Sequence, residues 1–361
     1  MAALLRAQRA LQAWRWDAVR AAAPALLAAA DTAPAGRLLL ALAGAAGRPD
    51  AAAVAAVRSA VAGIALFDAY RYFDPILGLD GRSITSTVCA LDCWLSIAGH
   101  DAFLLEYPKC GRTWLRLMVG RCIERLFGVT LPDATDLAAA AERCPGLPRI
   151  AVTHDDDPEL KAPAQVARDK RIYRGKRVLL QVRDPRDVVV SYYFQATTRR
   201  HAAFPSEPFR GALAQFVRHP TGGIPAIVAF YNAWAAGRGE PARFLLLAYE
   251  DLRADTRVAL RATLDLVGLP PLPDADLDAV IADCSFARMR ALEAAGAIAD
   301  PRLRPGDPAN PESWKVRRGK VGGYRDYLSE DDVAWIDAYL DRHLDDAYAR
   351  YKRAETARGH P

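Results

Sequence analysis

The chain has 361 residues, of which 52% are hydrophobic, and this is enough apolar material to bury a large core and to exclude a disordered protein. Its 48 basic and 43 acidic residues leave a formal charge of only +5, which favours a small anionic ligand over a nucleic acid, because nucleic-acid binders usually carry a stronger basic stripe. The six cysteines show no paired spacing, as is typical of reduced thiols in the cytoplasm.

The first 98 residues are predicted to form an all-α N-terminal region. They are rich in alanine, and Asp17 and Asp50 each open a helical stretch, 33 residues apart. This spacing is close to the period of helix-hairpin repeats, although two copies are fewer than such arrays need to be stable alone. We therefore expect these helices to pack on the following domain, on a protein partner or in a dimer contact.

No secretory signal or membrane span is expected near the N-terminus. Arg6 and Arg9 interrupt the first apolar stretch, and the most apolar window, residues 51–67, contains Arg58. That window is also shorter than the roughly 20 residues that a spanning helix requires. A packed helix and a cytoplasmic location are the resulting predictions.

Residues 78–81 predict a turn, and residues 86–97 predict a helix that leads into the next domain. Cys89 and Cys93 are four residues apart with His100 nearby, which is an incomplete set of zinc ligands. Because a fourth ligand is missing, we favour a buried helix face and predict no metal.

A strand, a loop and a helix are predicted in succession from residue 102 to residue 127. An apolar run at 103–105 precedes the loop YPKCGRTW at 107–114, and apolar residues then recur at helical spacing. The amides around Gly111 can face an anion where the helix begins, and Lys109 adds a positive charge. The pattern indicates a phosphate site, whereas the short Lys-x-Gly core alone would fit an ordinary turn.

The loop at 107–114 differs from a nucleoside triphosphate loop, which requires Gly-x-x-x-x-Gly-Lys-Ser/Thr, because here Lys109 precedes Gly111. It resembles the first signature of sulfotransferases that use 3′-phosphoadenosine 5′-phosphosulfate (PAPS), Tyr-Pro-Lys-Ser-Gly-Thr-Thr-Trp, and departs from it at Cys110 and Arg112. The resemblance implies an α/β, three-layer, P-loop-like fold with a central parallel sheet. It also implies that the donor is bound by Lys109, Cys110, Gly111, Arg112, Thr113 and Trp114.

The departure at Arg112 leaves two directions open for its side chain. It adds a second cation at the phosphosulfate, or it points away to pair with an acidic neighbour. We expect the outward direction, towards the rim, because Lys109 and the loop amides already neutralise much of the anion.

A second strand, predicted at 149–153, delivers Thr153 and His154 at its carboxyl end, where ligand crevices of open α/β sheets lie. A histidine at a strand end is often structural. The resemblance nevertheless implies that His154 is the general base, since a Thr-His pair takes this role in sulfotransferases. Residues 155–157 are all aspartate and have three open roles: to polarise His154, to recognise a substrate, or to form a solvated loop.

A third strand at 177–182 precedes a helix that starts at Asp184-Pro185. The segment from Arg183 to Ser191 resembles the second sulfotransferase signature, Arg-Asn/Asp-Pro-Lys/Arg-Asp-x-x-x-Ser-Tyr-Tyr. The resemblance implies that Arg183 and Ser191 bind the 3′-phosphate. As alternatives, Arg183 pairs with Asp187 and Ser191 lies on the helix surface.

Three later segments also resemble parts of the nucleotide site. Tyr249 follows a strand at 244–247, and the resemblance implies that it contacts adenine. The resemblance also implies that the ring of Phe286 stacks on adenine; the alternative is that Phe286 belongs to the core. The basic stretch 314–324 resembles the loop that folds over the 3′-phosphate, with Arg317, Arg318 and Gly319 at the binding positions and Gly-Gly-Tyr in place of the usual Gly-Asp-Trp.

The resemblance covers about residues 99–345 and implies a catalytic domain at 99–361. The implied reaction moves a sulfuryl group from PAPS to an acceptor hydroxyl, with Lys109 and His154 as catalytic residues and without a metal. Loops at 201–209, 218–225 and 295–311 are the expected acceptor pocket, and their basic residues favour a saccharide, a glycolipid or another polar acceptor. The alternatives are a P-loop nucleotide kinase and a non-catalytic adaptor.

Overall fold

The computed structural model describes residues 2–12, 15–30, 32–46, 50–62, 97–198, 209–296, 305 and 307–353. The chain divides into two compact units. The first comprises Met1–Asp101 and Arg171–Lys176, and the second comprises Ala102–Lys170 and Arg177–Pro361. The turn expected at 78–81, the cysteines at 89 and 93, and nearly all of the helix expected at 86–97 lie outside the described residues.

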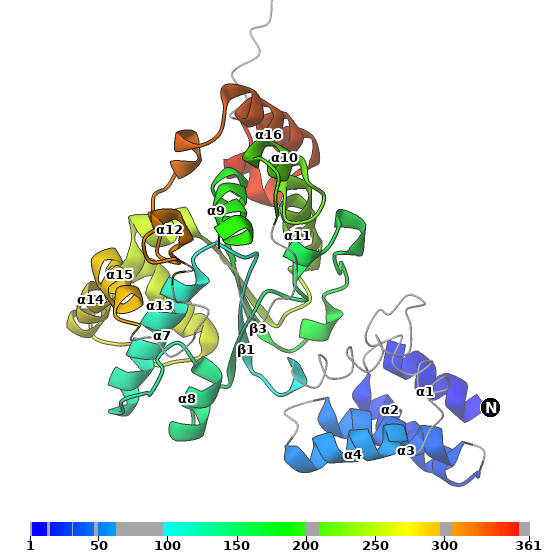
Figure 1. Ribbon diagram of the computed structural model, residues 1–361. Coiled ribbons are helices and arrows are strands. Elements are labelled where there is room, and N and C mark those ends of the chain that lie inside the picture. Colours follow the sequence, from blue (N-terminus) through cyan, green and yellow to red (C-terminus); the bar gives the residue numbers. More distant parts are fainter. Residues whose placement is uncertain are drawn as a thin grey trace, which may run out of the picture. The chain divides into compact units, whose positions relative to one another are not determined.

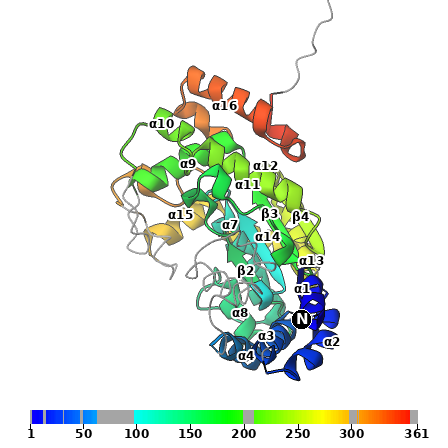
Figure 2. The same ribbon diagram turned by 90° about the vertical axis from the view of Figure 1, so that its right-hand side faces the viewer.

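The first unit is helical, as predicted for the N-terminal region. Its helices α1 to α4 lie together and bury leucines and alanines in a core of their own (Figures 1 and 2). Asp50 caps α4, since its carboxylate accepts a hydrogen bond of 2.7 Å from the amide of Ala53. The bounds are α1 (Ala2–Gln12), α2 (Trp16–Leu27), α3 (Ala33–Ala45) and α4 (Ala51–Ala62). Whether these helices are repeats stays a prediction.

The second unit is built on a parallel sheet, which confirms the predicted fold class. Its four strands run in the order β2-β1-β3-β4, and all pairs are parallel. Leu104 pairs with Val152 on one side and with Leu179 on the other. The strands are β1 (Ala102–Glu106), β2 (Ile150–Thr153), β3 (Arg177–Val182) and β4 (Arg243–Ala248). β1 and β3 are buried along almost their whole length, which explains their continuous apolar sequences.

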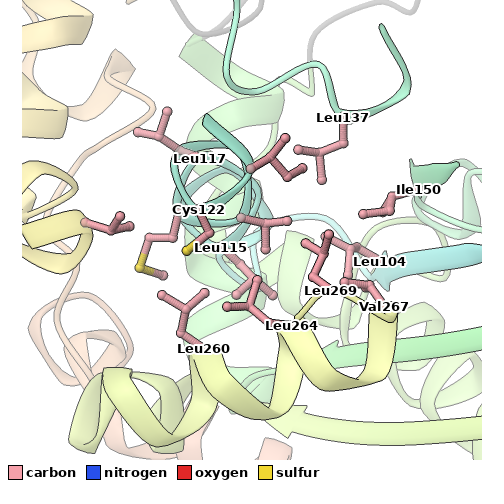
Figure 3. Close-up of a cluster of buried hydrophobic side chains, with 14 of the residues drawn as sticks. Leu104, Leu115, Leu117, Cys122, Leu137, Ile150, Leu260, Leu264, Val267 and Leu269 are labelled. Atoms are coloured by element: carbon pink, nitrogen blue, oxygen red, sulfur yellow. The ribbon is translucent and has the colours of Figure 1, made fainter. Parts of the chain in front are cut away.

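Helices cover both faces of this sheet and complete the three layers (Figure 1). On one face, α7 (Arg112–Phe127), α8 (Leu137–Arg143) and α13 (Thr256–Val267) enclose an extensive apolar cluster, which Figure 3 shows around Leu115, Leu260 and Leu264. On the other face, α11 (Ile224–Gly237) stacks Trp234 on Phe244 of β4. The core is therefore apolar on both sides of the strands.

The remaining helices of the second unit surround the carboxyl end of the sheet or pack on α7. They are α9 (Pro185–Thr198), α10 (Leu213–Arg218), α12 (Tyr249–Ala254), α14 (Asp274–Asp283), α15 (Phe286–Ala294) and α16 (Glu330–His343). Single turns of 3-10 helix occur at Pro158–Leu160, Pro163–Gln165, Pro311–Ser313 and Gly323–Asp326, and a longer one at Asp346–Tyr351. None of the helices in the described ranges is long and apolar enough to cross a membrane.

The acidic, alanine-rich run at 133–142 predicts a helix, but α8 begins only at Leu137. Asp133 instead forms a turn, in which its carboxylate accepts bonds from the amide and the hydroxyl of Thr135. Asp136 then caps the helix by accepting from the amide of Ala139 at 3.0 Å. Aspartates favour turns and caps over helix interiors, which accounts for the difference.

The order of the strands determines where a ligand crevice lies at the edge of the sheet. β1 lies between β2 and β3, so the connections that leave β1 and β3 diverge at the carboxyl edge of the sheet and leave a crevice between them. The loop after β1 carries Lys109, and the loop after β3 carries Arg183. The two strongest sequence motifs therefore meet at one switch point.

Gly120 provides a test of how closely α7 packs on the backbone around Ala134. A Cβ atom at Gly120 would lie 1.8 Å from the carbonyl oxygen of Ala134, and backbone cannot yield as a flexible side chain does. We expect Gly120→Ala to lower the free energy of unfolding by about 1–3 kcal/mol, measured by urea denaturation. Gly239→Ala is the control, because no heavy atom lies within 4 Å of its Cβ position. Equal stability of the two variants would contradict the packing described.

Candidate active site

The loop after β1 adopts an unusual backbone conformation. Gly111 is the N-cap of α7 with φ of 105°, which favours glycine, and a Cβ there would lie 2.7 Å from the ring of Tyr249. Lys109 also has a positive φ of 81°, which is uncommon for a residue with a side chain. Such strain is typical of functional loops, since the surrounding structure must hold it.

This loop forms one wall of a pocket of about 1000 Å³, open solvent at its mouth included. The second signature and the basic loop at 314–324 form the other walls. Of the residues predicted to bind the donor, those that line the pocket are Lys109, Gly111, Arg112, Thr113, Trp114, Arg183, Ser191, Tyr249, Phe286, Arg317, Arg318 and Gly319. Segments that are up to 210 residues apart in the chain thus converge on one cavity.

Cys110 is the one predicted donor residue whose side chain does not reach the pocket. Its thiol is fully buried and lies 3.6 Å from the hydroxyl of Tyr231, and burial raises the pKa of this thiol well above its usual range. The Tyr231 hydroxyl also donates to the carbonyl of Arg183 at 2.7 Å and accepts from its amide at 2.9 Å. Tyr231 therefore ties the loop after β1 to the loop after β3, a role that the sequence did not indicate.

Arg183 lines the pocket, and its side chain is well buried. Its guanidinium pairs with Asp187 at 3.2 Å, as the alternative interpretation had it, and it also lines the pocket. The guanidinium also donates to the carbonyls of Lys320 at 2.8 Å and Lys109 at 3.4 Å, and it stacks 4.5 Å from the ring centre of Tyr249. These contacts fix its orientation, so that it presents a positive charge to the cavity.

Asp187 explains how the basic loop is held. Its carboxylate accepts hydrogen bonds of 2.9 Å from the amides of Gly322 and Tyr324. The departure from Gly-Asp-Trp to Gly-Gly-Tyr therefore does not remove the anchor, because the bonds come from the backbone. Within the loop, Arg317 donates to Glu312 at 2.8 Å and Arg318 donates to Asp326 at 3.0 Å.

The two residues expected to contact adenine lie close together. The Tyr249 hydroxyl donates to the carbonyl of Gly319 at 3.3 Å, and its ring meets Trp114 edge-on. Phe286 is 38% exposed and lines the pocket, so the alternative of a core phenylalanine is wrong. The three rings provide an apolar surface on which a flat base can stack.

His154 and Arg112 are in direct contact. His154 does not itself line the pocket, but its Nε2 lies 2.7 Å from Nη2 of Arg112, which does. Its Nδ1 lies 3.1 Å from the carbonyl oxygen of Glu106, and the Glu106 carboxylate accepts a bond of 2.8 Å from the amide of Arg112. Burial raises the pKa of the Glu106 carboxyl, an effect that the nearby Arg112 opposes.

The expected outward direction of Arg112 is wrong. The side chain turns inward, towards Glu106 and His154, because the buried carboxylate of Glu106 attracts the guanidinium more effectively than the solvated rim does. The acidic neighbour was anticipated, but its place at the end of β1 was not.

The three aspartates after His154 differ in their contacts. The side chain of Asp155 is only 8% exposed, and its carboxylate accepts from Lys170 at 2.5 Å and from the indole of Trp234 at 2.9 Å. Asp156 pairs with Lys161, and Asp157 precedes the 3-10 turn at Pro158–Leu160. All three have positive φ angles. Through the Trp234 contact, Asp155 anchors the loop to α11.

A comparison with known proteins identifies the family of this chain. The model of the sulfotransferase domain family matches residues 99–348, which is more than half of the chain. The chain belongs to this sulfotransferase family.

Among its relatives are plant enzymes. Cytosolic sulfotransferase 17 of Arabidopsis thaliana is 27% identical over 256 residues, which cover 67% of this chain and 73% of the relative. Flavonol 3-sulfotransferase of Flaveria bidentis is 26% identical and covers 68% and 82%. A solved mouse sulfotransferase in complex with PAP is 18% identical, covers 68% of this chain and 84% of that one, and has a TM-score of 0.46.

Several pocket residues of this sulfotransferase were missed by the sequence analysis. Those without an earlier role are Glu106, Val190, Arg253, Met289, Lys315, Val316, Lys320 and Tyr327. Gln195 of α9 was also missed, and its side-chain oxygen accepts from Lys109 at 3.2 Å. Glu106 had a detectable signal, since a charged residue at the carboxyl end of a buried strand is rarely structural alone. Val190, Lys315, Val316 and Lys320 lie inside predicted motif segments without a role of their own, and Met289 lies three residues after Phe286. For Arg253, Tyr327 and Gln195 no sequence pattern indicated the position.

Proposed function

We propose that the protein transfers a sulfuryl group from PAPS to an acceptor hydroxyl, and that residues 99–361 form its catalytic domain. One observation carries this proposal: the phosphate loop after β1, the second signature after β3 and the basic loop at 314–324 line a single pocket. A nucleotide with phosphates at its 5′ and 3′ positions needs cations and amides at two separated points, and this pocket offers both.

Different residues of the pocket would hold the different groups of the proposed donor. The amides of residues 111–113, at the start of the 16-residue helix α7, would hold the 5′-phosphate, together with the Thr113 hydroxyl. Arg183, Ser191 and the loop with Arg317 would hold the 3′-phosphate, and adenine would stack near Phe286 and Trp114.

The chemistry assigned to the side chains is proton transfer and charge stabilisation. The acceptor oxygen forms a bond to sulfur while the bond from sulfur to the bridging phosphate oxygen breaks, and the hydroxyl proton passes to Nε2 of His154. Negative charge grows on the leaving phosphate, and the ammonium group of Lys109, which lines the pocket, would stabilise it. In this proposal lysine and amide donors supply the charge stabilisation, and no metal takes part.

We expect Arg183→Ala and Ser191→Ala to weaken nucleotide binding more than they slow the chemical step, because the 3′-phosphate is remote from sulfur. Arg183 should matter more, since a charged hydrogen bond contributes about 1.5–3 kcal/mol and a neutral one about 1 kcal/mol. Calorimetric titration with adenosine 3′,5′-bisphosphate (PAP) checks this. A larger loss of affinity in Ser191→Ala than in Arg183→Ala would contradict the assignment.

The acceptor is proposed to be a saccharide, a glycolipid or another polar hydroxyl compound, and the reaction is proposed to occur in the cytoplasm. The basic residues of the expected acceptor loops support this proposal, and residues 201–208, 297–304 and 306 of these loops lie outside the described part of the chain. A screen of saccharides, phenols and steroids with ³⁵S-labelled PAPS tests the proposal, with boiled protein as the blank. Transfer to phenols or steroids alone would overturn the acceptor class, and no transfer from PAPS to any hydroxyl would count against the function.

A further inference from the structure

The nitrogen that the proposed base needs for catalysis is engaged by an arginine. A guanidinium has only donors, so the 2.7 Å contact requires that Nε2 of His154 accepts from Arg112. The ring proton is therefore on Nδ1, which donates to the Glu106 carbonyl at 3.1 Å. This is the neutral form that a general base requires, but its lone pair is already in use.

Glu106 holds the backbone of Arg112 and stays close to its guanidinium. The carboxylate accepts from the Arg112 amide at 2.8 Å, and its second oxygen lies 3.6 Å from Nε of the same residue. Glu106 is only 4% exposed, so its charge is poorly solvated and keeps the cation near.

Arg112 also faces the nucleotide pocket. It is one of the lining residues, next to Thr113 and in the same loop as Lys109. The one side chain thus touches both the base and the cavity where the donor is proposed to bind.

We propose that Arg112 is a positioning residue that couples the donor site to the base. It donates to Nε2 and thereby holds His154 in the Nδ1–H form, and it turns towards the phosphate or sulfate of a nucleotide that fills the pocket. This movement frees Nε2 for the acceptor hydroxyl. The inference rests on the proposed function, and it predicts that the donor must bind before the base becomes available.

It is physically favourable for Arg112 to exchange the imidazole of His154 for a phosphate or sulfate group. A guanidinium forms bidentate, charge-assisted bonds with a phosphate or sulfate, whereas it forms one bond with a neutral imidazole. Glu106 keeps its hold on the backbone amide of Arg112, so only the side chain has to turn. The threonine of the related signature is too short to bridge to His154 in this way, which makes the coupling a property of the arginine.

The test uses histidine labelled with ¹⁵N, read by NMR in the full chain. The Nε2 resonance of His154 is compared in wild type, Arg112→Thr and Arg112→Lys, before and after addition of PAP, and a His154→Ala spectrum assigns it. Arg121→Thr is the matched control, because Arg121 lies on α7 and pairs with Glu124, away from this pocket. Thermal melting reports whether each variant folds, and the lysine variant keeps the test open if Arg112→Thr does not fold.

We expect the wild-type Nε2 resonance to differ from that of Arg112→Thr, and PAP to move it towards the position it has in that variant. Arg121→Thr should respond as wild type does. Identical Nε2 resonances in wild type and both Arg112 variants would overturn the inference, and so would an unmoved wild-type resonance when calorimetry shows that PAP binds. Failure of PAP to bind at all would instead overturn the proposed donor site and, with it, the coupling.

Discussion

The His154→Ala variant is expected to lose about 10²–10⁴-fold in turnover, which is the usual contribution of a general base. The described hydrogen bonds between His154, Arg112 and Glu106 include no second imidazole that could accept the proton in its place. Because His154 does not line the nucleotide pocket, the variant should not lose affinity for PAP. Turnover of labelled PAPS and calorimetry with PAP together measure the two effects.

His343→Ala is the control for this loss. His343 lies at the end of α16, and its ring packs on Tyr339, outside the pocket. Its removal should leave turnover and PAP affinity at the wild-type level. Near wild-type turnover of His154→Ala at neutral pH would show that another group accepts the proton.

The Lys109→Met variant is expected to lose about 10²–10³-fold in turnover, the range found when one donor to a developing negative charge is removed. Methionine keeps most of the apolar stem of lysine, so the change isolates the ammonium group. The contact with Gln195 is lost with it. Initial rates at saturating PAPS measure the effect on the chemical step.

Lys352→Met serves as the charge-matched control, because Lys352 pairs with Asp346 and does not line the pocket. It should turn over as wild type does. If Lys109→Met raised only the KM for PAPS and left kcat unchanged, Lys109 would contribute to ground-state binding and the assignment of its catalytic role would be wrong.

The parts of this fold that follow local rules could be predicted from sequence. The apolar run before Lys109 and the continuous run at 177–182 have the composition of buried parallel strands, and β1 and β3 are found there. Gly111 marks the start of α7, because its φ of 105° suits few other residues. The residues predicted to bind the donor came from the motif segments of the sequence, and all of them except Cys110 line the pocket.

What the sequence could not give are contacts between residues that are distant in the chain. Tyr231 joins two loops through its hydroxyl, and no pattern in α11 distinguishes this tyrosine from a core residue. The inward turn of Arg112 depends on Glu106, whose charge is buried only once the sheet has formed. Burial in the tertiary structure determines the contacts of Tyr231 and of Arg112, and local sequence propensity does not indicate such burial.

The measurement that tests the central claim most directly is a calorimetric titration of the full chain with PAP, adenosine 5′-monophosphate and ATP with magnesium. A pocket with cations for two separate phosphates should bind PAP tightest, and loss of the 3′-phosphate should weaken binding. Arg183→Ala should abolish most of the difference between PAP and the monophosphate. Equal affinity for PAP and the monophosphate, or preference for ATP with magnesium, would contradict the account.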